Sequence, residues 1–323
     1  MNIRVHLQGI MGLICGLALL GSLVHAQKGE AATYYVATNG SDSNSGTEEQ
    51  PFQTIARGVL DLSPGDILYV KNGTYTAWGR GMPSGASWDS PITIAAYPGH
   101  SPVIVKSAQD VITLHFIDTS YIVIDGFVID GTSAVNGVKI TYESSIAHHI
   151  RIQNSEIAYA TVGIFVTPGS DGNEFINLQV HNNGTTDFDH GVYLTSSDNL
   201  VEGCSIHDNA GWGVHIYSGG SANNNIIRNN TIYNNGRSGS RGDGIFLSSG
   251  SGNQAYNNDV SGNIGGIRID YGASNTYVGN NTVHGNPAFS IFIGGSSSNT
   301  LIESNNTDGQ AIIDEGITTR ILP

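Results

Sequence analysis

Two short patterns of small, apolar and polar residues alternate along the second half of the chain. In the first, a small residue is followed by apolar, variable and apolar positions, with starts at Gly137, Gly163, Gly191, Gly213, Gly244, Gly266 and Ser290. In the second, an Asn-rich turn enters a short apolar strand, as at Asn154, Asn177, Asn229, Asn257 and Asn280, and Gly203 fills the missing register. Starts of the first pattern are 22 to 31 residues apart. Self-similarity at such a period is typical of a solenoid.

Each repeat predicts two or three short strands and leaves no stretch long enough for an amphipathic helix. A single coil cannot bury its apolar face alone, but stacked coils bury Val, Ile and Leu and join their strands in parallel ladders. Asn and Gly suit turns that need a positive φ. The pattern therefore predicts an all-β parallel β-helix of roughly ten to twelve coils. A propeller is the competing architecture, but no four-strand blade pattern recurs.

The first part of the chain differs from the regular repeat. Residues 1–26 hold Arg4, an apolar run and the small-residue ending Val24-His25-Ala26, which predict a cleaved secretory signal peptide and a secreted, periplasmic or extracellular protein. No later segment is long and apolar enough to predict a membrane span. We expect a single domain over residues 27–323, with an N-terminal cap and first coils over 27–110 and regular Asn-rich coils over 111–323. Helical spacing over Gln53–Leu62 predicts a short helix in the cap.

Charge and cysteine content narrow the function classes. The formal net charge is -14 and only 12% of residues are charged, so a nucleic-acid partner is excluded by repulsion. Without residues 1–26 the only cysteine is Cys204. An internal disulfide is therefore excluded, and we expect Cys204 to pack in the interior.

The residues of the cap also carry a family resemblance. Tyr34 through Gly73-Thr-Tyr, then Ser90-Pro-Ile-Thr-Ile-Ala-Ala-Tyr-Pro-Gly and the Asn-rich coils, resemble the secreted right-handed parallel β-helix proteins of the pectate-lyase-like superfamily. That group includes polysaccharide lyases and mannuronan epimerases. The resemblance implies a right-handed coil and an extracellular polysaccharide as partner.

Candidate chemistry gathers on one predicted sheet face. In each Gly-apolar-x-apolar strand the two apolar residues face inward, so x and the residue two positions later must face solvent. The residues so placed in four adjacent coils are Tyr193, His215, Tyr217, Arg268 and Asp270, and those bordering the face are Asp189, His190, Arg241 and Asp243. Basic residues are scarce in this chain, so Arg268 beside two Tyr and a His indicates a site.

The residue types suit chemistry on a uronate polymer. A lyase or epimerase must neutralise the sugar carboxylate, remove the proton on carbon 5 and protonate an oxygen or the opposite face. We assign the carboxylate to Arg268, with Arg241 as second choice, because a guanidinium binds carboxylate bidentately. His215 or His190 is the expected base and Tyr193 or Tyr217 the expected acid. The other substrate-binding candidates are Asp189, Asp243 and Asp270. Asp187-Phe188-Asp189-His190 also resembles the Asp-Pro-His segment of mannuronan epimerases, which implies an active-site role for Asp and His.

Two other functions stay open. Hydrolysis needs two carboxyl groups beside a glycosidic bond, which Asp243 and Asp270, or Asp189 and Asp243, could supply. A non-catalytic carbohydrate-binding or cell-surface protein needs no catalytic group. The pattern requires no cofactor, although Asp187 and Asp189 offer oxygen ligands for Ca²⁺.

Overall fold

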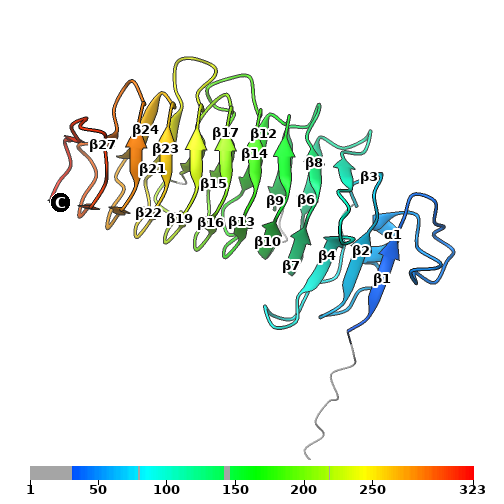
Figure 1. Cartoon of the computed structure of the whole chain (residues 1–323). Coiled ribbons are helices and arrows are strands. Elements are labelled where there is room, and N and C mark those ends of the chain that lie inside the picture. Colours follow the sequence, from blue (N-terminus) through cyan, green and yellow to red (C-terminus); the bar gives the residue numbers. More distant parts are fainter. Residues whose placement is uncertain (1–30, 79–80, 142–145, 218) are drawn as a thin grey trace, which may run out of the picture. The chain divides into compact units, whose positions relative to one another are not determined.

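The computed structural model describes residues 31–78, 81–141, 146–217 and 219–323. The predicted signal peptide lies outside these residues. Ala31–Pro323 form one compact unit, in which successive coils stack in sequence order (Figure 1). Within the described residues, no helix has both the length and the apolar character needed to cross a bilayer.

The coils build three parallel sheets. The first sheet has the strands β1 (Thr33–Val36), β2 (Ile67–Val70), β4 (Ile92–Ala96), β7 (Ser120–Asp125), β10 (His148–Gln153), β13 (Glu174–Ile176), β16 (Leu200–Glu202), β19 (Ile226–Arg228), β22 (Gln254–Tyr256), β25 (Tyr277–Gly279), β28 (Leu301–Glu303) and β30 (Arg320–Leu322). The second has β3 (Thr74–Thr76), β5 (Val103–Val105), β8 (Val128–Asp130), β11 (Glu156–Ala158), β14 (Gln179–His181), β17 (Ser205–His207), β20 (Thr231–Tyr233), β23 (Asp259–Ser261) and β26 (Thr282–His284). The third has β6 (Ile112–Phe116), β9 (Asn136–Ile140), β12 (Val162–Val166), β15 (Val192–Leu194), β18 (Val214–Ile216), β21 (Asp243–Ser248), β24 (Gly265–Asp270), β27 (Ile291–Ile293) and β29 (Ile313–Asp314).

The predicted parallel β-helix is confirmed, but the number of coils is smaller than predicted. In the part of the chain that the structure describes, the first sheet has 12 strands and the other two have 9 each, so about nine coils are complete rather than ten to twelve. The difference arises at both ends: β1 to β2 adds a helix and loops but no strand to the other sheets, β2 to β4 adds only β3, and β28 to β30 adds only β29. The helix α1 (Ile55–Val59) is shorter than its predicted range. It begins after Thr54, whose Oγ1 accepts a hydrogen bond from the Arg57 N–H at 3.1 Å.

Stacked asparagines close the turns between sheets. In pairs such as Asn229-Asn230, the first residue has a positive φ of 58° and the second is buried. The buried member joins a ladder in which each side-chain N–H donates to the Oδ1 of the next coil, as from Asn230 to Asn258 at 2.9 Å. These ladders satisfy the buried backbone N–H groups of the turns, as where Asn230 N–H donates to Asn258 Oδ1 at 3.1 Å.

Cys204 occupies an asparagine position of one ladder. Its N–H donates to Asn230 Oδ1 at 2.9 Å, and its Sγ accepts from the Leu178 N–H at 3.4 Å. The thiol is buried and unpaired, and burial raises the pKa of Cys204 to about 12. The predicted packing role is confirmed.

Candidate functional site

The variable positions of the third sheet form a continuous stack of side chains. The strand register places Phe165, Tyr193, His215 and Phe246 opposite one another. Their ring centroids are 5.2, 5.0 and 5.0 Å apart in that order, with interplanar angles of 9°, 13° and 6°. The next residue in the row is Arg268, whose guanidinium carbon lies 5.5 Å from the Phe246 centroid. The predicted shared face is therefore present, and its members also stabilise each other by stacking and cation–π contact.

Strand alternation predicted that every variable position of these strands faces solvent. This is wrong for His215 and Phe246. His215 is only 8% exposed and Phe246 only 4%. Trp212, from the turn before β18, covers both, with centroid distances of 4.8 Å to His215 and 5.6 Å to Phe246. His190 is buried under the same indole at 4.8 Å. Aromatic side chains thus build a second layer outside the sheet, which strand alternation alone does not reveal.

His190 and His215 form a buried pair. His190 Nε2 lies 3.2 Å from His215 Nδ1, so one nitrogen donates and the other accepts. Burial lowers the pKa of His190 to about 3. Burial and the neighbouring His190 lower the pKa of His215 well below its usual value. Both rings are therefore neutral near pH 7, and within the described residues His190 Nδ1 and His215 Nε2 have no hydrogen-bond partner.

Both histidines line a cavity of about 460 Å³ on this face. The lining residues are Phe188, His190, Tyr193, Trp212, His215, Tyr217, Arg241, Phe246, Ser248 and Tyr271. Burial raises the pKa of Tyr193, with a smaller contribution from Tyr217, so the Tyr193 hydroxyl stays protonated and can donate. This volume is in the range of small-molecule sites.

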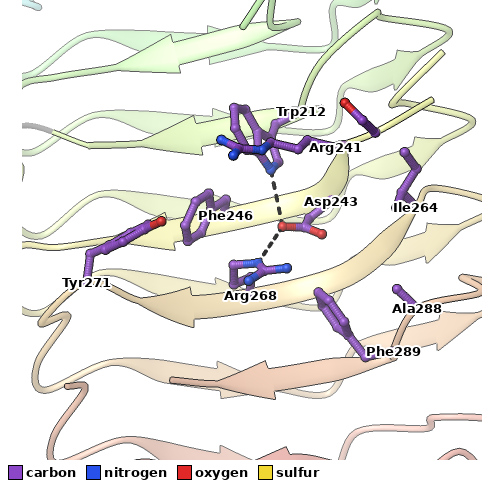
Figure 2. Close-up of a pocket in the computed structure, with 11 residues that line it drawn as sticks. Trp212, Arg241, Asp243, Phe246, Ile264, Arg268, Tyr271, Ala288 and Phe289 are labelled. Atoms are coloured by element: carbon purple, nitrogen blue, oxygen red, sulfur yellow. Dashed lines mark hydrogen bonds and ion pairs between the residues drawn. The ribbon is translucent and has the colours of Figure 1, made fainter. Parts of the chain in front are cut away.

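A smaller cavity of about 220 Å³ adjoins the first. Trp212, Arg241, Phe246 and Tyr271 line both cavities, and we call the two together the groove. Figure 2 shows Asp243 between Trp212 and Arg268 in the smaller cavity: Asp243 Oδ2 accepts from Trp212 Nε1 at 3.1 Å and from Arg268 Nε at 2.7 Å. Burial raises the pKa of Asp243, against the opposing effect of Arg268 and Trp212. Asp243 therefore fixes two groove side chains from neighbouring coils.

Arg268 and Arg241 differ in the carboxylates that lie close to them. Arg268 pairs with Asp243, and its Nη1 also lies 3.9 Å from Asp270 Oδ2. Arg241 makes no ion pair within the described residues, and only the charge of Asp187 acts on it from a longer distance. Its guanidinium carbon lies 5.6 Å from the Phe188 ring. A substrate carboxylate beside Arg268 would be repelled by the carboxylates of Asp243 and Asp270, which already lie close to that single positive charge. Arg241, the second choice from the sequence, is the better carboxylate ligand on charge grounds.

Arg241 lies in a loop, residues 236–242, that begins and ends with a glycine. Gly236 and Gly242 have φ of 87° and 151°, and a Cβ on Gly242 would overlap the Gly236 backbone. The loop is held to the turn two coils before it, because the Ser238 and Ser240 hydroxyls donate to the Asp187 carboxylate. These bonds, and to a smaller extent the charge of Arg241, lower the pKa of Asp187.

Two predicted residues lie outside the lining of the groove. Asp189 is buried, and its Oδ2 accepts from the N–H groups of Thr185 and Thr186 at 2.8 and 2.7 Å, which closes a turn. Asp270 contacts Arg268 at the edge of the site. Their substrate-binding roles stay predictions, as does a Ca²⁺ site at Asp187 and Asp189: within the described residues, no group of three or more His, Cys, Asp or Glu could hold a metal ion.

Several groove residues were not assigned a role from the sequence. Trp212 stands just before a repeat strand and Phe246 is the variable position of another, but their aromatic character alone did not distinguish a site from ladder packing. Tyr271 has a φ of 51° and is 65% exposed. Such a backbone conformation is unfavourable for a bulky residue, and it is visible only in three dimensions.

Comparison with known proteins gives the class of the chain. A family model described as "Pel9A-like, right handed beta helix region" matches residues 34–187. Pectate lyase L of Dickeya chrysanthemi is 25% identical over 215 residues, which are 66% of this chain but 40% of that protein. The crystal structure of pectate lyase Pel9A is 18% identical, with a TM-score of 0.62 over 88% of this chain and 78% of that one. The A-module of mannuronan C-5 epimerase AlgE4 from Azotobacter vinelandii is 16% identical, with a TM-score of 0.51 over 80% and 87%.

The fold and these relatives place the chain among the right-handed parallel β-helix proteins of the pectate-lyase-like superfamily, as the sequence resemblance predicted. More particularly, the chain belongs to the family described as "Periplasmic copper-binding protein (NosD)", whose model matches residues 119–316.

The described residues do not fit the copper named in that family description. They contain no cluster of three or more His, Cys, Asp or Glu side chains suited to a metal. The Cys204 thiol is held inside an asparagine ladder, and the Met82 thioether accepts a hydrogen bond from Trp78 Nε1 at 3.3 Å. Any chemistry in the groove therefore rests on its own side chains and not on a bound copper ion.

Proposed function

We propose that the chain binds a uronate-containing polysaccharide along the groove and cleaves or epimerises it. The observation that carries the proposal is the lining of the larger cavity: Arg241 without a carboxylate partner in the described residues, beside neutral His215 and protonated Tyr193. The relatives that bear the names of pectate lyases and a mannuronan epimerase support a polysaccharide substrate. The family description and the predicted signal peptide support action in the periplasm or outside the cell.

Each step has a group suited to it. Arg241 binds the uronate carboxylate and stabilises the negative charge that develops when the carbon 5 proton leaves. His215 accepts that proton, because its ring is neutral, and the bound carboxylate raises the pKa of the histidine toward neutrality. In elimination, the electrons of the broken C–H bond form a double bond between carbons 4 and 5 while the carbon 4–oxygen bond breaks. Tyr193 or Tyr217 then protonates the leaving oxygen. In epimerisation the proton returns to carbon 5 from the opposite face.

Hydrolysis is less well supported by the same geometry. Asp243 and Asp270 both contact Arg268, and Asp189 is occupied by backbone N–H groups. None of these carboxyl groups lines the larger cavity.

A non-catalytic carbohydrate-binding protein is the second candidate. It is favoured by the low pKa of both histidines, because a general base works best when its pKa is near the operating pH. The exposed rings of Tyr217 and Tyr271 at the groove would serve binding alone as well.

The proposal is tested by incubating residues 27–323 with pectate, alginate and glycosaminoglycans, with and without Ca²⁺. Ultraviolet absorbance detects unsaturated uronate, a reducing-end assay detects hydrolysis, and deuterium incorporation at carbon 5 in D₂O detects epimerisation. We expect either unsaturated uronate or deuterium incorporation, and we expect Arg241→Ala to abolish that signal. Arg237→Ala, which removes an exposed arginine of the same loop, should retain it. Reducing ends without unsaturation would indicate hydrolysis. Binding without any product would support the second candidate.

A further inference from the structure

A separate cavity of about 360 Å³ lies in the turns between the second and third sheets, away from the groove residues. The turn after β11 contributes Tyr159 and Thr161, that after β8 contributes Ser133 and Val135, and that after β14 contributes Asn182 and Thr185. Ala134, Ala160 and Gly184 complete the lining. All the lining residues are uncharged.

Tyr159 is the unusual residue of this cavity. It directly follows a strand of the second sheet and has a φ of 67°. The equivalent residues of the later coils, which also have positive φ, are Asn182, Asp208, Asn234, Gly262 and Gly285. These residue types tolerate the left-handed region, whereas a bulky aromatic residue is disfavoured there. Strain retained at one position of a repeat points to a role outside folding.

The Tyr159 side chain is presented to solvent. It is 55% exposed, although its ring centroid lies 6.1 Å from that of His181 in a T-shaped contact. The His181 ring nitrogen Nδ1 lies 2.9 Å from Asn182 Nδ2, so the supporting side chains are themselves fixed. Within the described residues, the hydroxyls of Ser133, Thr161 and Thr185 make no hydrogen bond to protein. The cavity thus combines an aromatic ring with hydroxyl groups available to a ligand.

We propose that this cavity, which we call the Tyr159 site, binds an uncharged sugar residue. A sugar ring has an apolar face that packs on an aromatic ring, and its hydroxyls pair with uncharged donors and acceptors. An anionic sugar would find no cation among the lining residues. The inference rests on the proposed function for the ligand being a glycan. It adds that the glycan has neutral residues at a distance from the uronate bound by Arg241.

The position of the Tyr159 site suits a longer ligand. Its Thr185 is two residues before Asp187, and Phe188 follows in the lining of the larger cavity. Successive coils are about 4.8 Å apart. A glycan that runs across neighbouring coils can therefore contact both sites.

The test is isothermal titration of residues 27–323 with neutral hexasaccharides of β-linked glucose, mannose or galactose. We expect at least one to bind, and Tyr159→Asn to weaken binding about tenfold, as expected for loss of an aromatic anchor. Asparagine suits the backbone of this position, so the variant should fold at least as stably as the parent by thermal unfolding. Tyr121→Asn is the matched control, because it replaces another tyrosine of positive φ, in β7 of the first sheet and outside the lining of the groove and of the Tyr159 site. We expect it to leave the affinity for the neutral hexasaccharide within about twofold.

The inference is overturned if no neutral hexasaccharide binds the parent chain, or if Tyr159→Asn binds as tightly as the parent. Its failure is distinguishable from failure of the proposed function. Turnover of a uronate polymer without neutral-sugar binding refutes the Tyr159 site alone. Neutral-sugar binding lost in Tyr159→Asn, without turnover of any uronate polymer, supports the site and refutes the proposed reaction.

Discussion

The buried pair of His190 and His215 predicts that mild acid destabilises the fold. An unfolded histidine has a pKa of about 6.5, whereas burial lowers the pKa of His190 to about 3. Between these values the unfolded chain binds more protons than the folded chain. The stabilisation is therefore fully present above a pH of about 6.5 and is lost as the pH falls toward 3.

The size of the effect follows from the same shift. Each pH unit below the unfolded pKa costs about 1.4 kcal/mol per histidine that stays neutral in the folded chain. At pH 5, His190 alone should reduce the free energy of unfolding by about 2 kcal/mol relative to pH 7. His215 acts in the same direction, because its pKa is also lowered by burial.

The assay is urea unfolding followed by tryptophan fluorescence at pH 7 and pH 5. We expect the pH-dependent loss of stability to be about 2 kcal/mol smaller in His190→Gln than in the parent, whatever the variant's stability at pH 7. His284→Gln, which removes a histidine beside Asp259 on the second sheet, should retain the parent's loss. Equal pH dependence in the parent and His190→Gln would show that burial does not keep His190 neutral in the folded chain. So would an NMR titration in which the His190 ring protonates near pH 6.5, the ordinary histidine value.

Three further variants test how the coils and the groove are held. Asp243→Ala should lower the free energy of unfolding by about 2 kcal/mol, because it leaves the buried Trp212 N–H without a partner and part-exposed Arg268 with only its contact to Asp270. Asp270→Ala should cost less than about 1 kcal/mol, and equal losses in chemical denaturation would contradict the assignment of Asp243 as the main partner. Cys204→Asn should raise the free energy of unfolding by about 1 kcal/mol, since an amide replaces weak thiol contacts to Leu178 N–H and Phe175 C=O; a lower thermal midpoint would show that the ladder cannot take an amide there. Thr54→Ala should cost about 1 kcal/mol by removing the cap of α1, and unchanged unfolding would indicate that this helix adds nothing to the stability of the cap.

The fold could be predicted because the same stabilising interactions recur in every coil. Every coil has inward Val, Ile or Leu at the same register, and pairs such as Asn229-Asn230 place one residue in a turn and the next in a buried ladder. A pattern that recurs in each coil needs no knowledge of distant contacts. The coil count was too high because the repeat period was applied to the cap as well, where α1 and its loops take up residues without adding strands to the second and third sheets.

The site could be predicted only in part. Strand alternation correctly placed Tyr193, His215 and Arg268 on one face. It could not show that Trp212 covers His215, because the indole reaches the face from a turn. Nor could it show that Asp243 already neutralises Arg268, since that contact joins side chains of neighbouring coils. We therefore propose Arg241, rather than Arg268, as the ligand of the substrate carboxylate.

We propose that the polysaccharide binds in the groove of the third sheet with its carboxylate on Arg241. A crystal structure of the chain with a bound oligouronate tests it most directly. We predict a sugar ring in the cavity lined by Tyr217, Trp212 and Tyr271, with its carboxylate in a bidentate contact with Arg241. An oligosaccharide bound on the first or second sheet, or one whose carboxylate does not contact Arg241, would refute this binding mode.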